Sequence, residues 1–145
     1  NYGVHQWISH QFLHGGITHL LFNMIALFSF GPMIEKYFGK DFIWFYLISG
    51  LGAALLQFLF VPDTALLGAS GAIFGVLMVY AILYPNSKIL LFFVIPIKSK
   101  WLMSAILGLE VYLGFFGESD GIGHLAHLGG AITGFLYFMT TKKVK

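Results

Sequence analysis

Cysteine and arginine are both missing from the sequence of 145 residues, and charged residues make up only 10% of it. The lack of cysteine excludes disulfides and thiolate chemistry, although it says nothing about the redox compartment. The eight basic charges are all lysines, and they form no basic patch interleaved with aromatics, so no nucleic-acid partner is expected. Soluble globular domains carry about 25% charged residues, and this chain is far from that class.

The sequence is rich in apolar residues. Hydrophobic residues make up 58% of the chain, and the mean hydropathy is +0.83. This composition predicts an integral membrane protein whose main partner is the lipid bilayer. Low-complexity tracts and repeat periods are both missing, so a single domain over residues 1–145 is expected.

Charges divide the apolar sequence into segments of about the length that crosses a membrane, roughly 20 residues. The predicted fold is therefore all-α, a polytopic membrane helix bundle. Its five predicted spans cover residues 17–36, 42–62, 65–84, 101–117 and 121–141. The apolar stretch Ile89 to Ile97 is too short to cross and contains Pro96, which predicts an interfacial elbow.

The distribution of charge predicts the orientation of these spans, because lysines are retained on the cytoplasmic side. If the helices alternate, every lysine falls on one side, and the acidic connectors with Asp63, Glu118 and Asp120 fall on the other. The histidines share that outer side: His5, His10, His14, His19, His124 and His127. The C-terminus is thus expected to be cytoplasmic and the first residue external, which predicts a further membrane helix upstream.

Ser70 lies at the outer mouth of the third predicted span, in the sequence Gly68-Ala69-Ser70-Gly71. A serine in a membrane helix usually bonds back to a carbonyl one turn earlier, so by itself the residue is a weak signal. The flanking glycines permit close backbone approach, and Gly71 with Gly75 forms a small-xxx-small pair that predicts helix contact.

The last predicted span places His127, Gly130, Ala131 and Gly134 on one stripe of the helix. A neighbouring helix can approach closely beneath this imidazole. If that neighbour is the third span, Ser70 meets His127, and an ionisable group at such depth is a candidate for function. A purely structural histidine is the alternative.

A Ser-His dyad is predicted rather than a triad, because the acids of the outer connectors belong to loops. Glu110 is the one acid inside an apolar run, near the middle of the fourth span. A carboxyl group there should be protonated, paired or directed into the bundle. We expect a structural hydrogen bond from it rather than a catalytic role.

His19 and Asn23 lie four residues apart on the first predicted span, so they project from one helix face. They act either as hydrogen-bonding contacts between helices or as donors directed at a developing oxyanion. The spacing of His10, His14 and His19 also admits a metal site. However, zinc sites usually add cysteine or carboxylate ligands, so neither a metal nor another cofactor is predicted.

Three blocks together resemble the signature of the rhomboid intramembrane serine proteases. They are His14-Gly15-Gly16-Ile17-Thr18-His19-Leu20-Leu21-Phe22-Asn23, then Gly68-Ala69-Ser70-Gly71, then Ala126-His127-Leu128-Gly129-Gly130 with Gly134. Their order and spacing match the family over essentially the whole chain.

The resemblance implies a six-helix core in which the five spans here correspond to helices two to six. It implies Ser70 as nucleophile, His127 as general base, and an oxyanion hole made by His19, Asn23 and the Ser70 backbone N–H. His14 would order the preceding external loop. Phe74 stands where some relatives have a tyrosine that stacks on the histidine, so stacking is expected without the hydroxyl contact.

The expected function is therefore hydrolysis of peptide bonds in or near the membrane segments of single-span proteins. We expect a multi-pass protein of a bacterial cell membrane, with its active site facing the extracytoplasmic side. One rival is a catalytically inactive rhomboid-like factor that binds membrane proteins for quality control. A transporter using the outer histidines is a second rival, which lacks the support of an inverted repeat.

Overall fold

The computed structural model describes residues 3, 5–9, 16–62, 69–117 and 123–141. Its elements in chain order are α1 (Gln6–Ser9), α2 (Ile17–Phe38), the 3-10 turn η2 (Gly39–Asp41), α3 (Phe42–Phe60), α4 (Ser70–Leu83), β1 (Lys88–Leu91), β2 (Ile95–Lys98), α5 (Ser99–Phe116) and α6 (His124–Thr141). All five predicted helices are present, with ends that differ by a few residues from the predicted ones. Residues 65–68 and 121–122, predicted to be helical, lie outside the described residues.

Length and hydropathy support only part of the predicted span count. Within the described residues, the single helical stretch long and apolar enough to cross a membrane runs from Ile17 to Phe60 and includes an 18-residue window with a mean hydropathy of 1.8. α4 is apolar but has 14 residues, which is about 21 Å and short of a hydrocarbon core of about 30 Å. α5 and α6 have 18 residues each and include buried Glu110 and His124. The count of five spans therefore stays a prediction.

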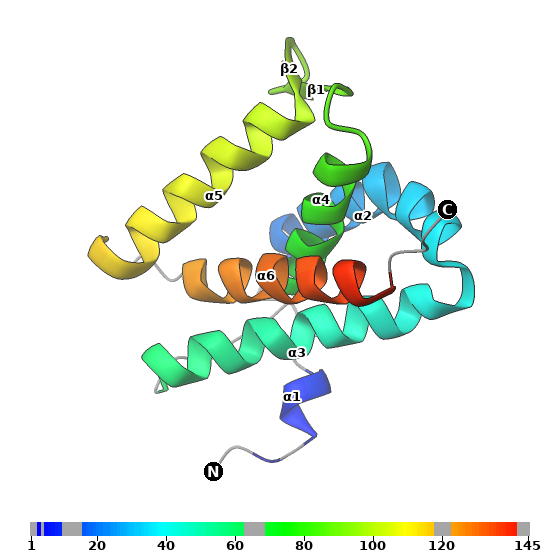
Figure 1. Ribbon diagram of the computed structural model, residues 1–145. Helices are drawn as coiled ribbons and strands as arrows, with labels where there is room; N and C mark the ends of the chain where they lie inside the picture. The colour runs from blue at the N-terminus through cyan, green and yellow to red at the C-terminus, as the bar shows by residue number, and fades with distance from the viewer. Residues whose placement is uncertain (1–2, 4, 10–15, 63–68, 118–122, 142–145) are drawn as a thin grey trace.

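α6 occupies the centre of the bundle, where it packs against both α3 and α4 (Figure 1). α3 runs alongside α6, whereas α4 crosses it steeply. A Cβ atom built on Gly130 would overlap the Gly71 carbonyl, and one built on Gly134 would lie 2.7 Å from the Cα of Gly75. The backbones of α4 and α6 therefore touch, which confirms the helix contact predicted from these glycines.

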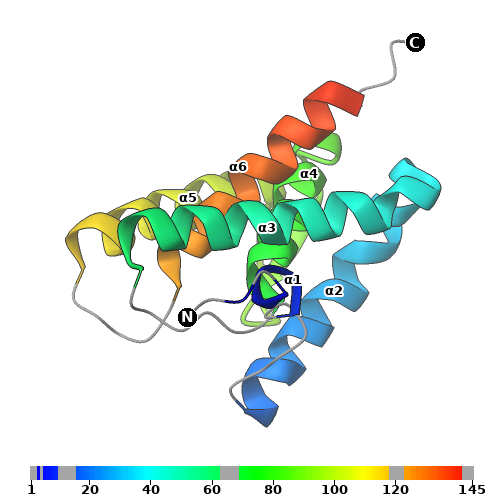
Figure 2. The same ribbon diagram turned by 90° about the horizontal axis from the view of Figure 1, so that it is seen from below.

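Large apolar side chains gather toward the far ends of α4 and α6, away from Ser70 and His127. This cluster joins four helices through Ile34 of α2, Phe45 of α3, Val76, Val79 and Tyr80 of α4, and Phe138 of α6. α2 and α3 diverge from η2 as the two arms of a V (Figure 2). The first turns of α4 and α6 thus meet outside the main apolar cluster, where polar side chains can gather.

The segment predicted to be an elbow is an antiparallel hairpin, in which Lys88 pairs with Lys98 and Leu91 with Ile95. Pro96 is accommodated because a sheet of two strands consists of edges alone, where a missing N–H is tolerated. Phe92 and Phe93 form its tip with φ angles of 52° and 62°, a left-handed conformation that is strained for bulky residues. The position of this hairpin at a membrane interface stays a prediction.

Candidate active site

Ser70 and His127 are brought together by the contact between α4 and α6. Ser70 begins α4, and its Oγ lies 3.1 Å from Nε2 of His127, which is 57 positions away in the chain. The distance is that of a hydrogen bond, in which the hydroxyl is the donor when Nε2 carries no proton. Since both side chains are only partly buried, the pair is a chemically accessible alcohol and imidazole.

Phe74 fixes the plane of the His127 ring. Its ring is nearly parallel to the imidazole, with an interplanar angle of 5° and a centroid separation of 4.2 Å. Phe74 lies one turn after Ser70 on α4, so one helix supplies both the hydroxyl and the stacking surface. The expected stacking is present, and it limits the imidazole to rotation within one plane.

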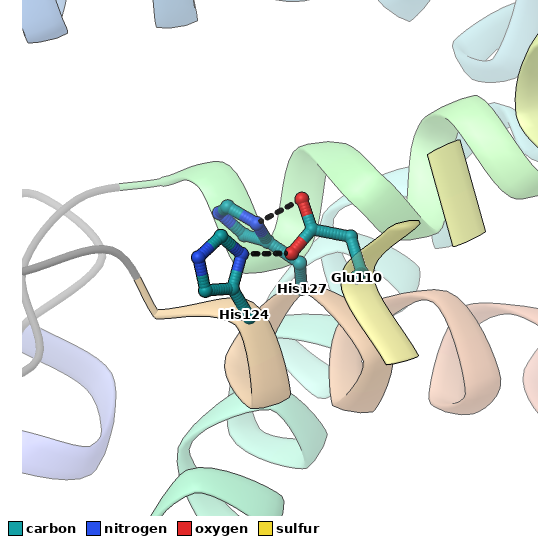
Figure 3. Close-up of side chains that lie close together, drawn as sticks. All are labelled: Glu110, His124 and His127. Carbon is teal, nitrogen blue, oxygen red and sulfur yellow. Dashed lines mark hydrogen bonds and ion pairs between the residues drawn. The ribbon is translucent and has the colours of Figure 1, made fainter. Parts of the chain in front are cut away.

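Glu110 approaches the same imidazole from α5 (Figure 3). Its Oε2 lies 2.5 Å from Nδ1 of His124, and its Oε1 lies 3.2 Å from Nδ1 of His127. The second contact has the distance of an ion pair without the alignment of a hydrogen bond, so Nδ1 of His127 is buried without an aligned partner in the described residues. All three side chains are at most 13% exposed.

The expectation that no carboxylate reaches the serine–histidine pair is wrong. Glu110 lies six positions before the end of α5, and His127 lies three positions after the start of α6. Because the two helices meet near these ends (Figure 1), Glu110 and His127 lie close together although they are far apart in sequence. The expected structural hydrogen bond from Glu110 is present and goes to His124.

The first turn of α6 is also held by a residue that the motifs did not indicate. Gln57 of α3 is buried, and its Oε1 accepts a hydrogen bond of 3.2 Å from the backbone N–H of Ala126. The first N–H groups of a helix have no partner within the helix, so this side chain satisfies one of them. The sequence did offer one signal for this role, because Gln57 is the one residue with a side-chain amide in the apolar run of α3.

His19, Asn23 and Ser70, the residues predicted for an oxyanion hole, all lie among the described residues, but the structure does not show them acting together. Asn23 of α2 is buried, and its Nδ2 has no hydrogen-bond partner within the described residues. It makes no hydrogen bond with Ser70, and His19 lies half-buried one turn earlier on α2. Gly68, His10 and His14 lie outside the described residues, so their predicted roles are not tested.

The group of Glu110, His124 and His127 also has the composition of a metal site. One ligand atom from each residue lies within 4.8 Å of the others, a spacing that could hold an ion. Two imidazoles and a carboxylate are a known ligand set for Zn²⁺. The metal site considered from the sequence involved His10, His14 and His19 instead, and the expectation of a metal-free protein stays a prediction.

A comparison with protein families places this geometry in context. The family model described as Rhomboid domain matches residues 2–143. The chain belongs to the rhomboid family. It is similar to RHOMBOID-like protein 4 of Arabidopsis thaliana, with 39% identity over 137 residues, or 89% of this chain. It is also similar to RHOMBOID-like protein 2 of the same plant, with 37% identity over 88% of this chain.

One bacterial relative is named as a protease. The rhomboid chain is 37% identical over 124 residues to Rhomboid protease GluP of Bacillus subtilis, covering 85% of this chain. The matches cover only 32%, 39% and 23% of these three relatives, so the chain spans about two fifths of their length or less. The mostly helical fold agrees with membership of the rhomboid family. At least one relative in this family is named as a protease.

Proposed function

We propose that this rhomboid-family chain is an intramembrane serine endopeptidase. Its substrates would be single-span membrane proteins, cleaved in or near their transmembrane segments. The observation that carries this proposal is the 3.1 Å separation of Ser70 Oγ and His127 Nε2. Similarity to a relative named as a rhomboid protease supports it.

The proposed reaction is acyl transfer followed by hydrolysis. Ser70 Oγ attacks the scissile carbonyl while its proton passes to His127 Nε2, and the imidazolium then protonates the leaving amine. Water, activated by the same imidazole, cleaves the acyl ester and restores the serine. The substrate segment must unwind, since a helix shields its carbonyls by hydrogen bonding.

The proposed setting is a lipid bilayer crossed by five helices of one domain, residues 1–145, equivalent to helices two to six of a six-helix core. Large apolar side chains exposed on α2, α3 and α5 favour contact with lipid, as at Phe28, Leu59 and Phe116, which are 78%, 64% and 77% exposed. The site would face the extracytoplasmic side and the C-terminus the cytoplasm. A bacterial cell membrane stays a prediction, because relatives come from a plant and a bacterium.

Covalent labelling by a fluorophosphonate tests the proposed nucleophile directly. We expect the purified protein to be labelled and Ser70→Ala to lose all labelling, since an activated hydroxyl attacks phosphorus and expels fluoride. Ser104→Ala is the matched control, because the Ser104 hydroxyl donates to the Lys100 carbonyl on the exposed face of α5. An unlabelled but folded wild type would favour the inactive binding factor.

Asn23→Ala is expected to slow hydrolysis by about 10²-fold or more without abolishing it, as for removal of one oxyanion donor. The reason is that Nδ2 of Asn23 is buried with no aligned partner in the described residues, so it is available to a developing negative charge. The measurement is kcat on a labelled single-span peptide in proteoliposomes. Asn86→Ala, in an exposed turn, is the control, and equal rates for both variants would reject the role.

A further inference from the structure

We propose that Glu110 is a positioning residue for His127, so that Ser70, His127 and Glu110 form a three-membered array rather than a dyad. The inference rests on the proposed function. It starts from the position of the carboxylate, which approaches Nδ1 of His127 at 3.2 Å while Nε2 faces Ser70 Oγ at 3.1 Å. The carboxylate and the hydroxyl thus lie at the two different nitrogens of one ring.

Two neighbouring helices restrain this ring through three side chains. α4 supplies Phe74, which fixes the ring plane, and Ser70, which lies at one nitrogen. α5 supplies Glu110 at the other nitrogen. A half-turn of the imidazole about its Cβ–Cγ bond would put carbon atoms at the positions of Nδ1 and Nε2, so the contacts with Glu110 and Ser70 both oppose it.

The proton on Nδ1 decides whether His127 can act as a base. Nε2 can accept the Ser70 proton only when the neutral ring carries its own proton on Nδ1. A carboxylate next to Nδ1 favours that tautomer and attracts the imidazolium that forms after proton transfer. Glu110 stays ionised throughout, and the proton moves only between Ser70 Oγ, His127 Nε2 and the leaving group.

His124 holds the carboxylate in place for this task. Its Nδ1 lies 2.5 Å from Oε2 of Glu110, so one oxygen is occupied and the other is directed toward His127 (Figure 3). The unaligned contact at His127 tightens when the ring gains a positive charge, as expected of an interaction that acts in the transition state. The competing interpretation is that Glu110 only ties α5 to α6 through His124.

The two interpretations differ in the response to Glu110→Gln and His124→Gln. Both variants lose the ion pair between Glu110 and His124, but only Glu110→Gln removes the charge beside His127. We expect the rate of Ser70 phosphonylation by a fluorophosphonate, and kcat on a single-span peptide, to fall about 10²-fold in Glu110→Gln at unchanged KM. His124→Gln should lower the rate by a smaller factor, less than about 10-fold, because the carboxylate stays beside His127 but loses the contact that holds it, with a similar shift in thermal midpoint.

A spectroscopic readout keeps the inference testable without any activity. ¹⁵N NMR of histidine-labelled protein, with the His127 signal assigned by its loss in His127→Ala, should report the Nδ1–H tautomer in the wild type and a mixture in Glu110→Gln. Equal losses of rate in the two variants, or an unchanged tautomer, would overturn the inference. So would inactivation by a chelator with recovery on adding Zn²⁺, since the three side chains would then be metal ligands. Failure of the wild type to label, with the expected tautomers present, would instead count against the proposed protease.

Discussion

Replacement of His127 by alanine is expected to lower peptide-bond hydrolysis by at least about 10⁴-fold, down to the background seen with Ser70→Ala. Without the imidazole, the hydroxyl loses the base that lies 3.1 Å from it, and a neutral serine is a poor nucleophile. The leaving amine also loses its proton donor. Because both steps need the same ring, this loss exceeds that of any single oxyanion donor.

The double variant, Ser70→Ala with His127→Ala, gives the sharper test of this prediction. Residues that act as one unit show strongly non-additive effects, so we expect the double variant to be no slower than either single one. The measurement is kcat on a labelled single-span peptide in proteoliposomes. His5→Ala, at an exposed histidine near α1, should leave the rate unchanged. A His127→Ala protein that kept a tenth of the rate would contradict the role of general base.

Gly130→Ala is expected to destabilise the fold by about 3 kcal/mol or more, at the upper end of the cost of overpacking. The added methyl group would overlap the backbone carbonyl of Gly71. A flexible side chain could move aside, but here the obstacle is the backbone of α4, so the two helices must separate. Ser70 precedes Gly71 directly, and the separation therefore also removes Ser70 from His127 and abolishes fluorophosphonate labelling.

Gly108→Ala provides the matched control on α5. A Cβ atom there meets nothing within 4 Å, and alanine is favoured over glycine within a helix by up to about 1 kcal/mol. We expect this variant to be as stable as the wild type or slightly more so, and to label normally. The measurement is the midpoint of thermal or denaturant unfolding in detergent. If both variants unfolded at the same midpoint, the close contact of α4 and α6 would be disproved.

The helices could be predicted from sequence because charges and turns interrupt long apolar runs. α2, α3, α5 and α6 begin or end within a few residues of the expected positions. The hairpin was not foreseen, since strands of four residues with a proline give no clear alternation. Its base is fixed by tertiary contacts, including a hydrogen bond of 2.7 Å between the hydroxyls of Tyr80 and Ser87, which local sequence does not reveal.

The site was predictable where its residues lie on glycine-containing stripes. Small residues beside Ser70 and His127 indicated which faces of α4 and α6 meet, and the close contact of those faces follows the expectation. Glu110 was different, because its face of α5 carries a single glycine one turn later, Gly114, and one small residue does not indicate which helix packs there. The contact of Glu110 with His127 depends on the rotation and height of α5 against α6, which neither periodicity nor spacing determines.

The separation of Ser70 and His127 by 57 positions has a consequence for the protein during its synthesis. Under the proposed chemistry, a chain still leaving the ribosome holds the alcohol long before it holds the base. The two side chains meet only after α6 has packed against α4 through the close contact of Gly130 with Gly71. Proteolysis would then begin only when the helices have assembled. An incompletely synthesised chain could not cleave nearby membrane proteins.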